Sequence, residues 1–256
     1  MKITLIPSAS GVRSVESTQY STSFLINDRV AIDAGSLGFH RQPSEQAAVR
    51  HVFLSHSHID HLASLPIFLE NIAGLAETPV TVHASQTVQQ CLRLDVFNSR
   101  LWPNFLELTL DGKPLVVLNT IEDGQTVAVE GLRITAVAVH HTVPTLGFII
   151  EDDAAAVVIS ADTGPTEAIW QRAKKLPNFK AVFLEATFPN AMKELADISK
   201  HLTPADFVRE MKKFDRPVPF YAIHLKAHFR DQVAEELLAS GQPGIMIAKS
   251  GSVYEF

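Results

Sequence analysis

The sequence predicts an α/β fold in which short strands alternate with helices. Short apolar or alternating runs recur from one end of the chain to the other, as buried and half-buried strands require. Stretches in which apolar residues follow a helical spacing lie between several of these runs. No linker, low-complexity tract or charge block divides the 256 residues, so we expect one α/β domain covering residues 1–256.

The first half of the chain is expected to be rich in strands. We predict strands at 2–6, 22–27, 29–33, 51–55 and 80–83. Asn27-Asp28 separates two of them and is a turn signal, which predicts a hairpin. Apolar residues at helical spacing predict helices near 62–72 and 84–96.

The second half continues this alternation. We predict strands at 115–118, 126–129, 131–139, 146–151, 155–160, 180–185, 218–223 and 245–248, and helices at 165–175, 203–213 and 229–239. The helix near 203 has the clearest start, with Thr203 as N-cap, Pro204 at the first helical position and Asp206 three residues beyond the cap. Only segment 97–114 reads as a long loop, a kind of segment that often shapes a binding site.

The composition excludes several classes of protein. Hydrophobic residues make up 46% of the chain and charged residues 20%, which is ordinary for a globular protein with a sizeable core. A net charge of −6 without a strong basic cluster argues against a nucleic-acid polymer as partner. Cys91 is the single cysteine, so no internal disulfide is expected. With neither a secretory leader nor an apolar run of about 18 residues, we expect a cytoplasmic protein without a membrane span.

The segment His56-Ser57-His58-Ile59-Asp60-His61 carries four potential metal ligands directly after an apolar run. Imidazole and carboxylate groups both bind borderline divalent ions such as Zn²⁺. Alternate side chains of an extended segment share a face, so His56 and His58 can reach one ion. Asp60 and His61 lie where the chain enters a predicted helix and can reach a second ion. The competing interpretation is a surface loop that is merely rich in histidine.

Three further apolar runs are followed directly by residues of the types that bind metals. The runs at 136–139, 157–161 and 220–223 lead directly into His140-His141, Asp162 and His224. A polar residue after one strand carries little information, because strands commonly end in this way. Several such strand ends together predict a site at one edge of a sheet, where a rigid scaffold holds the ligands within reach of solvent.

The order of these residues, HxHxDH followed by His, Asp and His, resembles the metallo-β-lactamase fold of hydrolases over essentially the whole chain. The resemblance implies an αββα sandwich of two mixed β-sheets with helices on the outer faces. It also implies two divalent ions, with Zn²⁺ favoured and Mn²⁺ or Fe²⁺ as alternatives. One ion would be held by His56, His58 and His141, the other by Asp60, His61 and His224, and Asp162 would bridge them. His141 is preferred to His140 because it precedes Gly147-Phe148 by the spacing of the phosphodiesterase branch.

Other phrases are similar to the class II 3′,5′-cyclic-nucleotide phosphodiesterases. They are Ile32-Asp33-Ala34-Gly35-Ser36, Phe97-Asn98-Ser99-Arg100-Leu101-Trp102-Pro103-Asn104, Asp162-Thr163-Gly164-Pro165-Thr166, Glu185-Ala186-Thr187-Phe188-Pro189-Asn190 and His201-Leu202-Thr203-Pro204. The first motif departs mildly from the usual pattern, with Ile59 in place of Leu. The resemblance implies that Glu185 orients His201, which protonates the leaving oxygen, and that Asp60 also orients the attacking hydroxide.

The function implied is two-metal hydrolysis of cAMP or cGMP to the nucleoside 5′-monophosphate, with a small cyclic nucleotide as the partner. Neither a nucleic-acid polymer nor a membrane is expected as a partner, and a homodimer stays open. Two alternatives remain, a phosphodiesterase for another substrate such as the tRNA 3′ end, and a non-catalytic metal-binding module of the same fold. Asp33 could either bond near the metals or simply end a strand. His228 could contact the substrate phosphate or lie on the surface.

Overall fold

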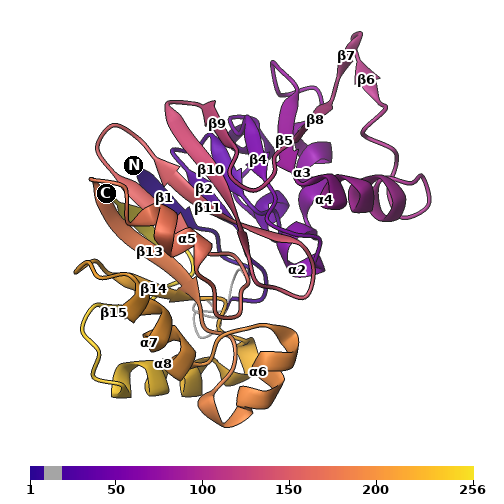
Figure 1. Ribbon diagram of the computed structural model, residues 1–256. Coiled ribbons are helices and arrows are strands. Elements are labelled where there is room, and N and C mark those ends of the chain that lie inside the picture. Colours follow the sequence, from indigo (N-terminus) through magenta and orange to yellow (C-terminus); the bar gives the residue numbers. More distant parts are fainter. Residues whose placement is uncertain (9–18) are drawn as a thin grey trace.

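The computed structural model describes residues 1–8 and 19–256 and contains two seven-stranded mixed sheets packed between outer helices (Figure 1). This is the αββα sandwich that the sequence resemblance implied. The two ends of the chain lie side by side, because the Met1 amino group donates a hydrogen bond of 2.7 Å to the Phe256 carbonyl.

The first sheet has the strand order β16-β1-β2-β3-β4-β5-β8. Its strands are β1 (Lys2–Leu5), β2 (Phe24–Ile26), β3 (Val30–Ile32), β4 (His51–Phe53), β5 (Val80–Ala84), β8 (Val116–Thr120) and β16 (Val253–Glu255). Asn27 and Asp28 both have positive φ and form the predicted hairpin turn between β2 and β3. β16 was not predicted from the sequence, and it gains its partners only by pairing with β1 at the far end of the chain.

The second sheet has the order β15-β14-β13-β12-β11-β10-β9. Its strands are β9 (Thr126–Val129), β10 (Leu132–Val139), β11 (Thr145–Glu151), β12 (Ala156–Ile159), β13 (Phe179–Glu185), β14 (Phe220–Ile223) and β15 (Ile245–Ile247). Strands β12 to β15 are parallel, and β10 runs in the same direction because both it and β12 are antiparallel to β11. The carboxyl ends of β10, β12, β13 and β14 therefore meet at one edge of the sheet.

Helices cover the outer face of each sheet. Beside the first sheet are α1 (Pro43–Gln46), α2 (Ile59–Leu62), α3 (Leu65–Ile72) and α4 (Gln86–Cys91), which continues as a π-helical turn over Leu92–Val96. Beside the second are α5 (Ala168–Ala173), α7 (Pro204–Lys213) and α8 (Arg230–Ala239), whereas α6 (Lys193–Ser199) lies beyond the edge of the sheet (Figure 1). Single 3₁₀ turns cover Leu37–Phe39, Asn190–Met192 and Ala227–Phe229. Neither α1 nor α6 was predicted, because both are short and bury few side chains.

Three apolar cores hold these layers together. The central core lies between the two sheets and is built on aromatic rings such as Phe24, Phe53, Phe148 and Phe183. One outer core joins the first sheet to α3 and α4, and the other joins the second sheet to α5, α7 and α8. Continuous burial on both faces explains why the central strands read as apolar runs in the sequence.

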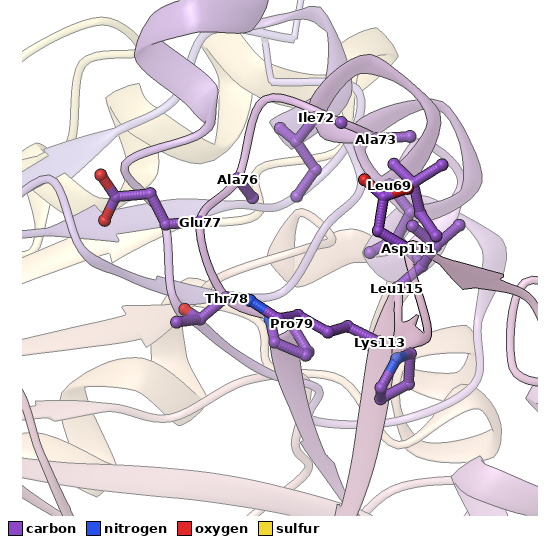
Figure 2. Close-up of a pocket in the computed structure, with 13 residues that line it drawn as sticks. Leu69, Ile72, Ala73, Ala76, Glu77, Thr78, Pro79, Asp111, Lys113 and Leu115 are labelled. Atoms are coloured by element: carbon purple, nitrogen blue, oxygen red, sulfur yellow. The ribbon is translucent and has the colours of Figure 1, made fainter.

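The long segment 97–114 does not shape the site described below. It ends in a small hairpin of β6 (Thr109–Leu110) and β7 (Lys113–Pro114), which projects away from β13 and β14 (Figure 1). Phe105 is buried, and Trp102 packs against the outer core of the first sheet. A cavity of about 190 Å³ lies between the end of α3 and this hairpin (Figure 2). Among the described residues, no helix is both long and apolar enough to cross a bilayer.

Candidate metal centre

The residues predicted as metal ligands lie together at the carboxyl edges of the two sheets. They form two groups in which the ligand atoms are all within 4.8 Å of one another: His56, His58, His141 and Asp162, and then Asp60, His61, Asp162 and His224. The four potential ligands of the HxHxDH motif follow β4 in the first sheet. The other three, His141, Asp162 and His224, follow β10, β12 and β14 in the second sheet. Each group thus combines side chains from both sheets.

Asp162 occupies the middle of the cluster. Its carboxylate oxygens lie within 4 Å of Nε2 in four imidazole rings: His61 at 3.3 Å, His224 at 3.5 Å, His56 at 3.8 Å and His141 at 3.9 Å. Of the seven ligand residues in the two groups named above, Asp162 is the one that belongs to both. This is the position that the resemblance implied for a residue between two ions.

The first motif straddles the start of a helix. His58 is the N-cap of α2 and has extended backbone. The ring centroids of His56 and His58 are 4.6 Å apart, which is compatible with the prediction that the two side chains share a face. Asp60 and His61 lie within α2 itself, so the helix predicted near 62–72 begins three residues earlier than expected. Helical backbone begins at Ile59 and is interrupted before Pro66, which occupies the first turn of α3.

Four of the rings are held through Nδ1, which leaves Nε2 facing the cluster. The partners of Nδ1 are Ser55 Oγ for His56 (2.9 Å), Asp33 Oδ2 for His61 (2.7 Å), the Lys200 carbonyl for His141 (3.1 Å) and Thr187 Oγ1 for His224 (2.9 Å). A ring whose Nδ1 carries the proton presents a lone pair at Nε2, the form in which imidazole binds a metal.

Asp33 is part of this support and does more than end a strand. It follows β3, is 1% exposed, and accepts hydrogen bonds from Ser55 as well as from His61. Its backbone has a φ of +59°, and Ala161 and His224 at two other strand ends have φ values of +54° and +56°. Left-handed backbone is uncommon for residues other than glycine and clusters at functional sites, where surrounding contacts maintain it.

The donor set fits a divalent cation. The Nε2 atoms of His56 and His61 are buried and have no hydrogen-bond partner among the described residues. Burial holds the pKa of the His56 ring well below its usual value, so this ring is a neutral donor. Burial also opposes charge on His61, but the carboxylates of Asp162 and Asp33 outweigh it and raise the pKa of His61 well above its usual value. Carboxylates that favour positive charge at the centre of a buried cluster also favour the binding of a metal cation there.

Glu185 and His201 form a hydrogen-bonded pair beside the cluster, as the sequence predicted. Glu185 is the last residue of β13 and has no exposed surface, and its Oε1 is 2.7 Å from His201 Nδ1. Burial tends to lower the pKa of His201, but the Glu185 charge and hydrogen bond outweigh this effect, so the pKa lies above its usual value. The His201 ring is stacked on that of His224 at a centroid distance of 5.5 Å.

Thr187 joins this pair to the metal cluster and was not singled out from the sequence. Its hydroxyl is 2.7 Å from Glu185 Oε2 and 2.9 Å from His224 Nδ1, and it is fully buried. An ionised carboxylate can only accept, so the hydroxyl donates to Glu185 and accepts the proton on His224 Nδ1. The only sequence signal was the position of Thr187, two residues after Glu185.

The two histidines left undecided by the sequence lie outside the cluster. His140 is exposed, and its backbone N–H donates to Thr163 Oγ1 at 3.1 Å. His141, in contrast, is 6% exposed and belongs to the first group of ligands. His228 is exposed in the turn before α8.

Comparison with known proteins agrees with this fold. A family model described as a beta-lactamase superfamily domain matches residues 28–225. The chain therefore belongs to the beta-lactamase superfamily and has the metallo-β-lactamase fold of its hydrolases. Its His/Asp clusters, together with this fold, suggest divalent metal binding.

Two relatives point to phosphodiester chemistry. A probable 3′,5′-cyclic-nucleotide phosphodiesterase of Yersinia pestis is 24% identical over 226 residues, which cover 77% of this chain and 63% of the relative. Ribonuclease BN of Proteus mirabilis is 25% identical over 122 residues, covering 47% of this chain and 37% of the relative. The chain thus matches less than two thirds of the length of either relative.

Two solved structures share the fold over almost their whole length. Unliganded yeast PDE1 has a TM-score of 0.77 at 15% identity, with 98% of each chain covered. The metallo-β-lactamase fold protein YhfI of Bacillus subtilis has a TM-score of 0.74 at 20% identity, with 99% of this chain and 98% of that chain covered.

Proposed function

We propose that the protein hydrolyses 3′,5′-cyclic nucleotides to nucleoside 5′-monophosphates with the help of two divalent ions. The observation that carries this proposal is the hydrogen bond between buried Glu185 and half-buried His201 at the edge of the His/Asp cluster. An alkyl phosphodiester has a poor leaving group and needs a proton donor at this point. The similarity to a probable cyclic-nucleotide phosphodiesterase supports the same substrate class.

The clustered side chains divide into two sets of ligands. One ion would be held by His56, His58 and His141, the other by Asp60, His61 and His224, with Asp162 between them. We favour Zn²⁺, with Mn²⁺ or Fe²⁺ as alternatives, because imidazole and carboxylate donors suit these ions. When bound, the two ions supply an acidified water and neutralise charge on the phosphoryl oxygens.

The side chains of the protein control the protons of the reaction. Asp60 accepts a hydrogen bond from the attacking water and so orients it. His201 keeps Nδ1 on Glu185, which leaves its Nε2 proton for the departing 3′-oxygen. As the new bond from the water oxygen to phosphorus forms, the bond from phosphorus to the 3′-oxygen breaks, and the 3′-oxygen leaves as a neutral hydroxyl. The Glu185 carboxylate is held beside His201 by hydrogen bonds that it accepts from Thr163, Thr187, His201 and Leu202.

A phosphodiesterase that acts on RNA is the second candidate, because ribonuclease BN is among the relatives. Such an enzyme must hold a long polyanion, which favours an extended basic surface. The projecting β6–β7 hairpin carries Lys113 two residues after Asp111, and the whole chain has a net charge of −6. These charges favour the small substrate.

Replacement of His201 by Ala tests the proposed acid. We expect the metal content and KM to be nearly unchanged and kcat on a cyclic nucleotide to fall by about 10²–10⁴-fold, the usual contribution of a positioned acid. Bis(p-nitrophenyl) phosphate has a leaving group that needs no proton, so its turnover should fall far less. Equal losses on both substrates would exclude the acid role.

A substrate panel tests the substrate class on the unaltered protein. Turnover should be highest with cAMP or cGMP, and lower with a 2′,3′-cyclic nucleotide and a precursor tRNA. Preferred cleavage of the tRNA would favour the ribonuclease candidate. A metal-loaded protein that turns over none of these substrates would favour a non-catalytic module of the same fold.

A further inference from the structure

A small pocket lies directly beside the candidate metal centre. It has a volume of about 90 Å³ and is lined by Gln19, Tyr20, Asp60, His224, Leu225, Lys226 and Ala227. Two of these side chains, Asp60 and His224, belong to the cluster itself. The volume is far below the roughly 300–1,000 Å³ of pockets that enclose a drug-sized ligand, so it suits a single functional group.

Gln19 offers an unused hydrogen-bond donor to this pocket. Its Oε1 accepts a hydrogen bond of 3.1 Å from the backbone N–H of His224, which cannot act as an acceptor. The orientation of the amide is therefore fixed by chemistry. Its Nε2 is buried and has no partner among the described residues. A buried amide without an acceptor is unfavourable, so the position favours a ligand that brings an oxygen.

Lys226 brings a positive charge to the same pocket. It follows His224 by two residues, and its backbone N–H donates to the Thr187 carbonyl, which holds this part of the chain against the Glu185–His201 pair. Within the described part of the chain, the Lys226 ammonium forms no ion pair. Its side chain is exposed and lines the pocket together with Asp60 and His224, so its charge lies beside the metal-ligand cluster.

We propose that Gln19 Nε2 and Lys226 Nζ form an oxyanion subsite that binds a phosphoryl oxygen next to the metal centre. A neutral amide donor and an ammonium together match the oxygens of a phosphate group, and both can donate to one oxygen. The inference rests on the proposed function in taking a phosphodiester as the substrate. Because hydrolysis adds a negative charge to the phosphoryl group, the subsite binds the monoester product more strongly than the diester substrate.

The test measures the binding of inorganic phosphate to the metal-loaded protein by titration calorimetry, with metal content determined for each variant. Lys226→Met removes the charge from an exposed side chain and should weaken phosphate binding by about tenfold, the loss of one charged hydrogen bond. Gln19→Glu keeps the oxygen that accepts from His224 but replaces the donor with a repelling carboxylate. It should weaken phosphate binding at least as much.

Lys180→Met is the matched control, because Lys180 is an exposed lysine at the opposite end of β13 from Glu185. Its phosphate affinity should stay within about twofold of the original. Unchanged phosphate affinity in both Lys226→Met and Gln19→Glu, at full metal content, would overturn the subsite. Loss of phosphate affinity in a protein that turns over no cyclic nucleotide would support the subsite and refute the proposed function instead.

Discussion

At the residue scale, the site depends on which nitrogen of each imidazole ring is hydrogen-bonded to another residue of the protein. His56, His61, His141 and His224 all use Nδ1 for this purpose. His58 is different, because its Nδ1 faces the cluster at 3.2 Å from His141 Nε2. In the other four rings the partner of Nδ1 therefore decides which nitrogen of the neutral imidazole carries the proton.

The adjacent pair His140 and His141 offers a direct test of this arrangement. We expect His141→Ala to lose metal from the first group of ligands, because its Nε2 points at Asp162 and His58. His140→Ala should keep the full metal content, because His140 is exposed and lies outside both groups. Elemental analysis of the two purified variants measures the difference. The reverse pattern would show that His140 is the ligand.

Thr187 is expected to position His224 and Glu185 without touching substrate. Thr187→Val has nearly the same shape but lacks the hydroxyl, so His224 loses the acceptor for its Nδ1 proton. We expect metal affinity at the group containing His224 to fall by about 10–100-fold, as for other residues that orient a ligand. Chelator competition measures this affinity. Thr187→Ser keeps the hydroxyl and should restore it, whereas a similar loss in both variants would indicate a packing role.

At the element scale, helix α7 follows the predicted start signal. The Thr203 hydroxyl accepts from the Asp206 backbone N–H, the Asp206 carboxylate accepts from Thr203, and Pro204 occupies the first turn. These contacts hold the beginning of α7 three residues after His201.

Thr203→Ala should therefore lower the free energy of unfolding by about 1 kcal/mol, the usual worth of an N-cap. Denaturant unfolding checks the value, and Thr203→Ser should retain most of the stability. A stability equal to that of the original protein in the Ala variant would mean that the cap contributes nothing here.

Strands β4 and β5 are joined by two neutral histidines, half-buried His51 and buried His83. His83 Nε2 is 3.0 Å from His51 Nδ1, the Asn119 amide donates to His83 Nδ1, and the ring stacks on Phe53. Burial, with a smaller effect of His51, lowers the pKa of His83 from 6.5 to about 4.

A histidine whose pKa is depressed by folding stabilises the protein above its unfolded pKa and loses that contribution as the pH falls. The contribution of His83 should thus be complete above pH 6.5 and disappear as the pH approaches 4. Denaturant unfolding at neutral pH and near pH 4.5 measures how much unfolding free energy is lost as the pH falls. We expect this loss to be smaller in His83→Leu than in the original protein. An identical loss in both proteins would contradict the assignment.

At the scale of the whole molecule, the metal centre joins the two sheets. The first motif belongs to the first sheet, and His141, Asp162 and His224 belong to the second, yet both groups of ligands draw on both sheets. A bound ion would therefore connect two halves that otherwise meet through the central apolar core.

Chelation should lower the melting temperature, because a ligand that binds only the folded state stabilises it by about 4 kcal/mol at 1,000 times its Kd. Calorimetry with and without a strong chelator measures the shift, and added Zn²⁺ should reverse it. A melting temperature that responds to neither treatment would show that the cluster does not bind metal in the folded protein.

The sequence by itself was sufficient to predict the fold and the clustered side chains. Apolar runs marked most strands, because the strands of a sandwich are buried on both faces and leave a strong pattern. The HxHxDH motif and the residues after three further strands carried the rest of the information, since their chemistry is visible one residue at a time. Short elements with few buried side chains, such as α1 and α6, left no comparable pattern and were missed.

Only the tertiary structure decided the partners of these side chains. Gln19 meets the backbone of His224 across 205 positions of sequence, Asp33 meets His61 across 28, and Thr187 meets His224 across 37. The reason is physical: periodicity in the sequence reports which face of a strand is buried, whereas a hydrogen bond depends on which loops converge when two sheets close on one another. The site residues could be recognised in the sequence, but the support that sets their tautomers and the pocket beside them arise from the packed fold.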